Sequence, residues 1–241
     1  MGDPALRLSY PKFDVITTSI NDTLKALSEV IIEGQIEDDG IFLSNFNGTI
    51  YPTVYDKEII KSTLGQESCT PMPYRDQNNI LYKGSASVID GKFSFSFIVP
   101  KDIAYNYGVG KISYYTVSDS EQNPVDGNGT DESFLIGGTA DDIIYDYDEA
   151  ELSLFMNDTL FVNGGITDEN PTLLAHVFDL SGINTVGNGI GHDITAVLDG
   201  NTANPYILND FYEAAKDDYT RGVIKFPLYN LSNGEHSIKL K

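Results

Sequence analysis

The strict alternation of residues 85–100, which read SASVIDGKFSFSFIVP, constrains the fold more than any other feature of this sequence. Phe93, Phe95 and Phe97 alternate with polar residues, so one face of this segment is aromatic and the other is hydrophilic. The dipeptide Asp90-Gly91 just before them is a favoured two-residue hairpin turn. The pattern predicts a half-buried antiparallel hairpin, and therefore a sheet that packs one face on a core.

The rest of the first half is predicted to consist of further strands separated by turn residues. The segments rich in β-branched and aromatic residues are 13–20, 30–36, 111–118 and 134–136. Residues 21–28 are predicted to form a turn or two of helix. Residues 119–131 are almost all turn formers and are predicted to be a loop.

The second half shows the same pattern of short strands separated by turn residues. Its predicted strands are residues 152–157, 172–179, 191–198, 223–228 and 236–240. Short strands at this spacing predict an all-β chain with two immunoglobulin-like antiparallel β-sandwich domains in tandem. The first domain is placed at residues 11–138, an acidic linker at 139–150 and the second domain at 151–241. Because the chain stops inside a strand pattern, we expect the second domain to be truncated at its C-terminal end.

Composition limits the classes of partner. The chain has 241 residues, which suits two domains, and 41% of them are hydrophobic, which suffices for real cores. Its formal net charge of −21 opposes any polyanion, so nucleic acid is excluded as a main partner. No apolar run is long enough to cross a bilayer, and no transmembrane segment is predicted.

Calcium is the one cation that the sequence favours. The most acidic segment contains Asp141, Asp142, Asp146 and Asp148, which carry the hard oxygen ligands that Ca²⁺ binds. Their spacing is not that of an EF-hand loop and lacks the glycine of its sharp turn. A solvated acidic linker is the favoured interpretation, and a calcium site is the alternative. No other cofactor is predicted.

No catalytic residue can be assigned from the sequence. Cys69 is the single cysteine and has no histidine signature near it, so a buried or incidental thiol is favoured over a nucleophile. His176, His192 and His236 show no metal-ligand spacing. The glycine-rich residues 181–194 around His192 could hold an anion, but they match no known phosphate-binding motif, and a glycine-rich hairpin is favoured.

Several segments resemble a known family. Residues 2–8, GDPALRL, resemble the segment that closes the caspase-like catalytic domain of gingipain-type cysteine peptidases and leads into an immunoglobulin-like domain. Residues 46–57, 76–115 and 161–200 are similar to the region that follows the peptidase domain in the type IX secretion sortases of Bacteroidetes. The similarity covers nearly the whole chain.

The resemblance implies a parent enzyme at the outer membrane, a cysteine endopeptidase that removes C-terminal sorting signals from exported proteins and helps attach them to surface lipopolysaccharide. The family's catalytic His and Cys belong to an upstream domain, of which residues 1–10 would be the tail, and Cys69 does not match its nucleophile motif. The chain is therefore expected to be a non-catalytic accessory region.

The resemblance also implies partners and a location. The partners are the upstream catalytic domain, outer-membrane type IX secretion components and exported cargo proteins. The location is extracytoplasmic: associated with the outer membrane, on the cell surface or in the periplasm. The alternative is a stand-alone cell-surface β-sandwich module that binds glycans or proteins.

Overall fold

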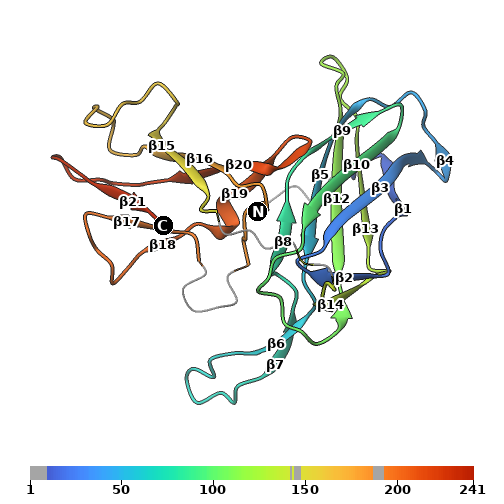
Figure 1. Cartoon of the computed structure of the whole chain (residues 1–241), viewed down its shortest axis with the longest axis horizontal. Coiled ribbons are helices and arrows are strands. Elements are labelled where there is room, and N and C mark those ends of the chain that lie inside the picture. Colours follow the sequence, from blue (N-terminus) through green and yellow to red (C-terminus); the bar gives the residue numbers. More distant parts are fainter. Residues whose placement is uncertain (1–9, 142, 144–147, 187–192) are drawn as a thin grey trace.

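The all-β prediction is confirmed. The computed structural model describes residues 10–141, 143, 148–186 and 193–241. Within these residues the chain forms β-strands and one short 3₁₀ helix, η1 (Asn209–Phe211), and contains no α-helix (Figure 1). No helix of the described part is long and apolar enough to cross a membrane.

The first half is built around a closed barrel of seven strands. In spatial order the strands are β1 (Phe13–Ser19), β13 (Asp126–Asp131), β12 (Lys111–Ser118), β5 (Gly48–Tyr55), β9 (Ala86–Ile89), β10 (Lys92–Ile98) and β3 (Glu29–Asp38). A pairing between β1 and β3 closes the ring. β1 and β13 run parallel, and the other neighbours in the ring run antiparallel. Two short strands extend this sheet, β4 (Ile41–Phe42) beside β3 and β8 (Ile80–Lys83) beside β5.

The predicted hairpin is present in the barrel wall. Asp90 and Gly91 have φ angles of 50° and 75°, and two positive φ angles are the mark of a type I′ turn. The three alternating phenylalanines of β10 are all buried. Phe95 and Phe97 stack on Tyr82 of β8, with ring centroids 5.4 Å and 4.9 Å apart. The alternation in the sequence therefore marks the barrel core.

The predicted loop at 119–131 is wrong in its second part, because residues 126–131 form β13 between β1 and β12. The glycines that suggested a turn serve a close approach of two backbones. A Cβ atom on Gly129 would lie 2.1 Å from the carbonyl oxygen of Val15, and one on Gly127 would lie 2.8 Å from that of Phe13. Glycine here lets β1 approach closely enough to close the barrel.

The predicted helix at 21–28 is also wrong. Residues 23–26 form β2 (Thr23–Ala26), which joins β14 (Leu135–Thr139) and β11 (Gly108–Val109) in a small three-stranded sheet. Leu24 and Ala26 are buried while the residues beside them are half-buried, which is the period of two that a strand requires.

The second half consists of two antiparallel sheets. One has the order β15 (Glu151–Met156), β16 (Thr172–Phe178), β20 (Asp218–Pro227) and β19 (Tyr212–Ala215). The other has the order β18 (Tyr206–Ile207), β17 (Thr195–Leu198) and β21 (Ile238–Leu240). The sheets share a core, since Phe226 of β20 lies against Tyr206 of β18 with ring centroids 5.1 Å apart.

The predicted tandem of immunoglobulin-like sandwiches needs correction. The first half is a closed barrel and not a sandwich, because β1 pairs with β3 as well as with β13 and so removes both open edges of the sheet. For the second half the immunoglobulin-like topology stays a prediction, as does the division into domains. β14 ends at Thr139 and β15 begins at Glu151.

The turn of the β19–β20 hairpin docks on the barrel. The Asp217 backbone N–H donates to the Ser85 carbonyl at 2.9 Å. The Ser87 N–H and hydroxyl donate to the two carboxylate oxygens of Asp217 at 2.7 and 2.6 Å. Lys216 Nζ lies 3.0 Å from the Thr49 hydroxyl. Together with a continuous buried core, these contacts hold the two halves against each other (Figure 1).

Candidate functional site

The predicted calcium ligands are described only in part. Asp141 forms an exposed ion pair with Lys25 at 3.1 Å, and Asp148 is also described. Asp142 and Asp146 lie outside the described residues. Among the residues that are described, no group of three or more His, Cys, Asp or Glu side chains could hold a metal ion. The calcium site therefore stays a prediction.

Two of the three histidines are described, and one of them, His236, lies between a carboxylate and a hydroxyl, as the histidine of a catalytic triad does. His176 lies in β16 with its ring centroid 5.7 Å from that of Phe155, and His192 lies outside the described residues. His236 Nδ1 lies 2.7 Å from the Asp199 carboxylate, and its Nε2 lies 3.4 Å from the Ser232 hydroxyl.

In this arrangement His236 is not a base for the Ser232 hydroxyl. Nε2 also lies 2.8 Å from the Ser232 carbonyl oxygen, which can only accept a hydrogen bond, so this nitrogen carries a proton. This bond, and then the one to Asp199, raise the pKa of His236. The nitrogen nearer the Ser232 hydroxyl therefore has no free lone pair with which to activate that hydroxyl. Its role is to tie the turn at Asp199 to the segment that leads into β21.

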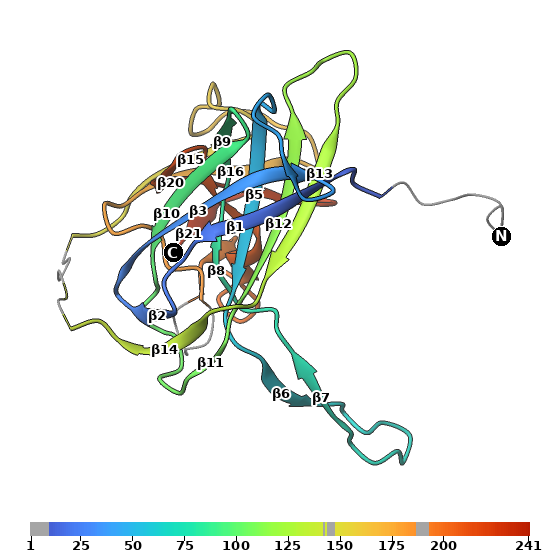
Figure 2. The same cartoon turned by 90° about the vertical axis from the view of Figure 1, so that its right-hand side faces the viewer.

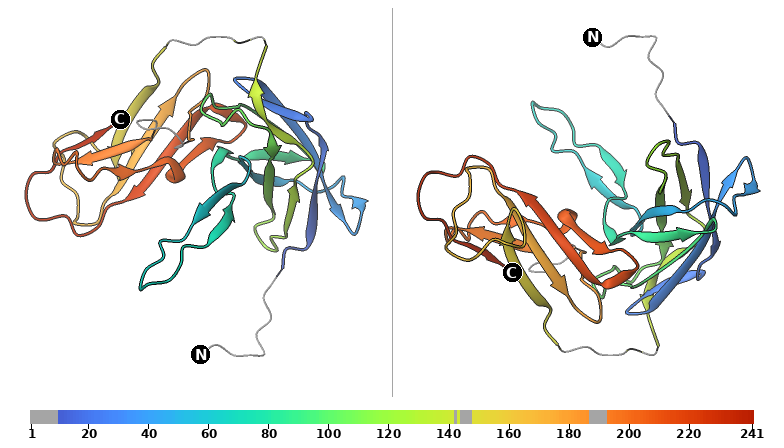
Figure 3. Two further views of the ribbon diagram at one scale, coloured as in Figure 1. Left: turned by 90° about the horizontal axis from the view of Figure 1, so that it is seen from below. Right: turned by 90° about the horizontal axis from the view of Figure 1, so that it is seen from above.

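The candidate site is a projecting ribbon of two strands. β6 (Ile59–Ser62) and β7 (Pro73–Asp76) pair with each other and, among the described strands, with no other. We call residues 58–76 the arm. Figures 2 and 3 show it extending away from the barrel as a separate spur, a place where a partner has free access.

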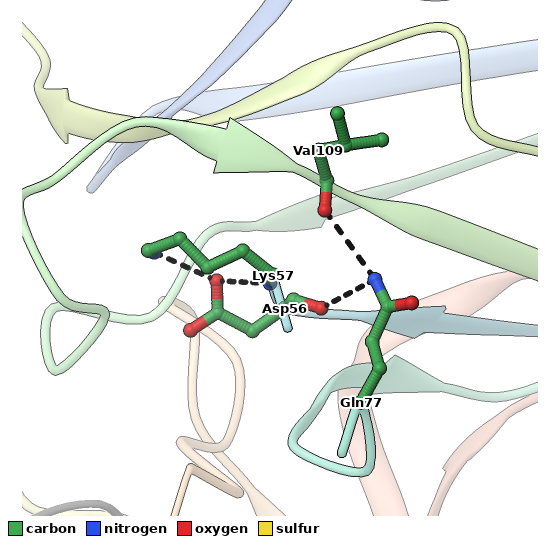
Figure 4. A network of polar contacts seen from close by, with 4 residues as sticks. All are labelled: Asp56, Lys57, Gln77 and Val109. Atoms are coloured by element: carbon green, nitrogen blue, oxygen red, sulfur yellow. Dashed lines mark hydrogen bonds and ion pairs between the residues drawn. The ribbon is translucent and has the colours of Figure 1, made fainter. Parts of the chain in front are cut away.

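The start of the arm is fixed to the barrel by a buried ion pair (Figure 4). Asp56 and Lys57 follow β5 directly, and their side chains are 3% and 5% exposed. Asp56 Oδ1 accepts hydrogen bonds from the Lys57 ammonium at 2.9 Å and from the Lys57 backbone N–H at 2.8 Å. A buried charge is costly unless it is paired, so this geometry leaves the chain little freedom where it exits β5.

Gln77 fixes the other end of the arm. Its side-chain amide donates to the Asp56 carbonyl at 2.9 Å and to the Val109 carbonyl at 3.3 Å (Figure 4). It therefore bridges the end of β7 to both the start of the arm and β11. We call Asp56, Lys57, Gln77 and Val109 the clamp. Both strands of the arm leave the barrel from this rigid base.

A hollow of about 350 Å³ opens at the base of the arm. Its lining consists of Asp56, Lys57, Glu58, Ile59, Asp102, Ala104 and Asn106. The only cationic group in this lining, the Lys57 ammonium, is already paired with Asp56, while two further carboxylates face the same space. The hollow is therefore net negative and unsuited to an anionic ligand.

The charges on the strands of the arm pair with one another. Lys61 Nζ lies 2.6 Å from the Asp76 carboxylate, and this hydrogen bond is the main cause that raises the pKa of Lys61. Arg75 Nη1 lies 3.1 Å from the Glu58 carboxylate. Between Ser62 and Tyr74 the sequence holds one charged residue, Glu67. The outer part of the arm is thus nearly uncharged.

The arm also exposes large apolar side chains. The exposed fractions are 78% for Ile60, 84% for Leu64, 67% for Met72 and 47% for Tyr74. Cys69 is exposed near the tip, so of the two alternatives predicted for it, a buried or an incidental thiol, the first is wrong. Four apolar side chains on an isolated two-stranded ribbon are typical of a surface that another molecule covers.

The comparison with solved structures identifies the relationship. The chain matches dimeric latent PorU from Porphyromonas gingivalis with 34% sequence identity and a TM-score of 0.56, over 100% of this chain and 23% of that one. This chain is a PorU-related all-β region. It spans about a quarter of the PorU chain that it matches, and the expected resemblance to this group is confirmed.

A second match among solved structures is too weak to carry an argument. The sporulation control protein Spo0M from Bacillus subtilis aligns over 91% of each chain, but at 11% identity and a TM-score of 0.28, which is too low to relate the folds. No protein-family model and no curated protein matches the chain.

The arm and its clamp were missed by sequence reasoning. Asp56 and Lys57 are adjacent charged residues, and a sequence pattern of this kind predicts exposed positions. They are buried only because the barrel covers them. The prolines Pro71 and Pro73 and the apolar residues between charged flanks were the signal that could have marked an edge ribbon.

Proposed function

We propose that this chain is the non-catalytic accessory region of a type IX secretion sortase, a gingipain-like cysteine peptidase that removes C-terminal sorting signals from exported proteins. The observation that carries the proposal is the 34% identity to PorU along the whole chain. Two described residues are consistent with it: His236 Nε2 lies 2.8 Å from the Ser232 carbonyl oxygen and is not free to act as a base there, and Cys69 belongs to no described group of three or more His, Cys, Asp or Glu side chains.

The role that fits this region is mechanical support of the upstream peptidase domain. The docked β19–β20 hairpin and the shared core join its halves, which favours a rigid body over two loosely tethered modules. Its other partners would be outer-membrane type IX secretion components or exported cargo, and its location would be extracytoplasmic, as the relationship to PorU suggests.

The test uses the longer polypeptide that contains this region. The melting temperature of the peptidase domain and the cleavage of a sorting-signal peptide are measured with residues 11–241 present and with these residues deleted. We expect the deletion to lower the melting temperature and the cleavage rate. The 241-residue chain alone should cleave no peptide. Cleavage by this chain, or a peptidase domain of unchanged stability after the deletion, contradicts the proposal.

Partners are tested separately by pull-down of outer-membrane proteins with the whole chain and with each half. Retention of a type IX component by one half would locate the contact. A stand-alone surface module that binds glycans or proteins is the alternative, and the exposed arm is the observation in its favour. A caspase-like domain encoded directly upstream supports the accessory role, whereas a lipoprotein signal at that position supports the alternative.

Two finer features of the prediction are part of this proposal. The four-stranded and three-stranded antiparallel sheets of the second half are the arrangement expected of an immunoglobulin-like sandwich. Calcium is proposed as a ligand of the acidic segment 139–150, and a melting temperature that does not change on addition of a chelator would rule it out.

We further propose that this region contributes a contact between two copies of the protein. The PorU of P. gingivalis to which it is similar is dimeric in its latent form. Sedimentation velocity over a range of protein concentrations tests self-association of the 241-residue chain directly.

A further inference from the structure

The hollow at the base of the arm has the size of a small-ligand site. Its volume of about 350 Å³ lies within the range of about 300–1,000 Å³ that is usual for such sites. Its lining comes from two segments that are far apart in the sequence, residues 56–59 after β5 and residues 102–106 between β10 and β11. A ligand in the hollow would therefore contact the barrel body and the base of the arm, and not the outer part of the arm.

One wall of the hollow is a buried carboxylate with an unused oxygen. The Asp56 side chain is 3% exposed, and both hydrogen bonds that it accepts from Lys57 end on Oδ1. No described residue donates to Oδ2 (Figure 4). Among the described side chains, the Tyr212 hydroxyl is the one buried polar group that is both sealed from solvent and without a partner, so Asp56 Oδ2 borders accessible space. Because Asp56 lines the hollow, that space is the hollow.

The ammonium of Lys57 also has unused hydrogen-bonding capacity. One of its three N–H groups donates to Asp56, and no other described residue accepts from it. Its position is fixed, since a Cβ atom on Gly108 would lie 2.8 Å from Lys57 Cβ, which means that the aliphatic part of Lys57 packs directly on β11. A buried ion pair is stable only when its remaining donors and acceptors are also satisfied. The hollow must therefore hold a group that both donates and accepts.

The rest of the lining adds mainly acceptors. Asp102 and Glu58 supply carboxylates, and Asn106 supplies an amide that donates and accepts. Both carboxylates are held in place from outside the lining: Asn184 Nδ2 donates to Asp102 Oδ2 at 2.6 Å, and Arg75 Nη1 donates to Glu58 Oε2 at 3.1 Å. The hollow thus combines several acceptors with one strong donor.

This combination selects the chemical class of the ligand. An anion is repelled by the carboxylates. A cation has no lone pair with which to accept from the Lys57 ammonium, whose charge repels it. A peptide group brings one N–H to a lining with several acceptors. Each hydroxyl group donates and accepts at once, so a molecule with several hydroxyls can replace water in this hollow without losing hydrogen bonds.

We propose that the hollow binds a neutral sugar residue. One hydroxyl of the sugar donates to Asp56 Oδ2, a second accepts from the Lys57 ammonium, and Asn106 binds a third. Ile59 and Ala104 of the same lining contact the C–H groups of the ring. The buried ion pair then has two tasks, because it fixes the arm and also presents one donor and one acceptor to the ligand. The inference goes beyond the accessory role and does not depend on it.

Sugars that differ in charge test the ligand class. Glucose, galactose and mannose are the neutral probes, and the amino sugar and the uronate of each are the cationic and anionic probes. Each is titrated into the 241-residue chain, and binding is followed by NMR through the side-chain amide signal of Asn106. We expect a millimolar dissociation constant for the hexose that binds best, because the hollow is small and open. Its uronate should bind at least about tenfold more weakly, and its amino sugar should bind no more tightly.

Two variants test the location of the site. Ala104→Trp fills the hollow from an exposed position and removes no polar group, so it should raise the dissociation constant about tenfold or more. Ala203→Trp is the matched control, because Ala203 is an exposed alanine in the turn between β17 and β18, and it should leave the constant unchanged. Asn106→Leu keeps the approximate size of the side chain but removes the amide, and it should also weaken binding, which is then followed through the signals of the sugar.

Every outcome bears on the proposal. The site is overturned if none of the three hexoses binds, if binding persists unchanged in Ala104→Trp, or if Ala203→Trp weakens it to the same extent. A uronate that binds as tightly as its hexose would reveal an anion site, and an amino sugar that binds more tightly would reveal a cation site. Either result overturns the neutral class. None of these measurements involves the peptidase domain, so a negative result leaves the accessory role intact.

Discussion

Two hairpins of this chain, β6–β7 and β19–β20, are fixed to the barrel in opposite ways. The β19–β20 hairpin turns at Lys216 and Asp217 and docks this turn on the barrel, where both carboxylate oxygens of Asp217 accept hydrogen bonds from Ser87. The β6–β7 arm is held at its base by the clamp, while its outer part, with Leu64 and Met72, remains exposed. One hairpin is fixed through its tip and the other through its base.

The difference shows how the same motif serves two purposes. A polar turn that finds partners within the chain joins the two halves of the molecule. An apolar outer ribbon without such partners, anchored on a rigid base, is a preorganised surface for another molecule, because little ordering entropy remains to be lost on binding. If this is right, substitutions at the clamp and at the docked turn change stability, whereas substitutions at the tip of the arm do not.

The largest effect is expected at the base of the arm. Lys57→Met removes the ammonium and leaves the Asp56 carboxylate buried at 3% exposure without its ion-pair partner. We expect the free energy of unfolding in urea to fall by about 3 kcal/mol, since breaking one side of a buried pair is strongly destabilising.

The control for this prediction is the double variant Asp56→Asn/Lys57→Met. It removes both charges but keeps an oxygen that accepts from the backbone N–H of residue 57. We expect it to recover more than half of the loss. A single variant as stable as the wild type would mean that the clamp does not fix the arm.

The second effect is expected at the docked turn. Asp217 has a φ angle of 60°, a conformation that glycine adopts without strain, so Asp217→Gly removes the side chain while keeping the turn. The loss of two hydrogen bonds to Ser87, which are partly open to solvent, should lower the free energy of unfolding by about 2 kcal/mol. Asp90→Gly is the control, because Asp90 also has a positive φ angle, of 50°. It measures how much the introduction of glycine at such a position changes stability by itself.

The third effect concerns a buried hydroxyl where the docked hairpin meets the barrel. Tyr212 opens β19, and its hydroxyl has no hydrogen-bond partner among the described residues. Burial is the main cause that raises the pKa of this phenol. Tyr212→Phe removes a polar group that is buried at a cost, so we expect the free energy of unfolding to rise by about 1 kcal/mol.

Tyr114→Phe is the matched control. The Tyr114 hydroxyl is also buried, but it lies 2.9 Å from the Thr17 hydroxyl, so its removal should lower stability by about 1 kcal/mol. The cavity of about 20 Å³ beside Tyr212 has room for one water molecule. A destabilised Tyr212→Phe would therefore show that a water satisfies the hydroxyl and that the prediction is wrong.

Some parts of the fold could be predicted from the sequence and others could not, and the difference has a physical reason. The β9–β10 hairpin was found because its signals are local: a turn that requires positive φ and side chains that alternate with a period of two. The closure of the barrel was missed, because β13 is held by its neighbours and its glycines serve a close approach of β1 and not a turn.

The candidate sites were less predictable than the fold. The His236–Asp199 contact joins residues 37 positions apart, and no spacing rule marks it. The clamp joins Asp56 to Gln77 and to Lys57, and the burial of these charges depends on how β5 leaves the barrel. That no catalytic residue could be assigned from the sequence followed from local information alone, since the argument needed only the count and spacing of His and Cys.

The smallest effect is expected at the tip of the arm and completes the comparison of the two hairpins. Leu64→Ser/Met72→Ser removes two exposed apolar side chains that are 84% and 67% accessible. Because they bury little surface within the chain, the free energy of unfolding should change by less than about 0.5 kcal/mol. The same double variant should reduce binding of a hydrophobic dye to the native chain. A loss of stability as large as that of Asp217→Gly would mean that the arm is part of the folded core, and the contrast between a docked hairpin and a free one would fail.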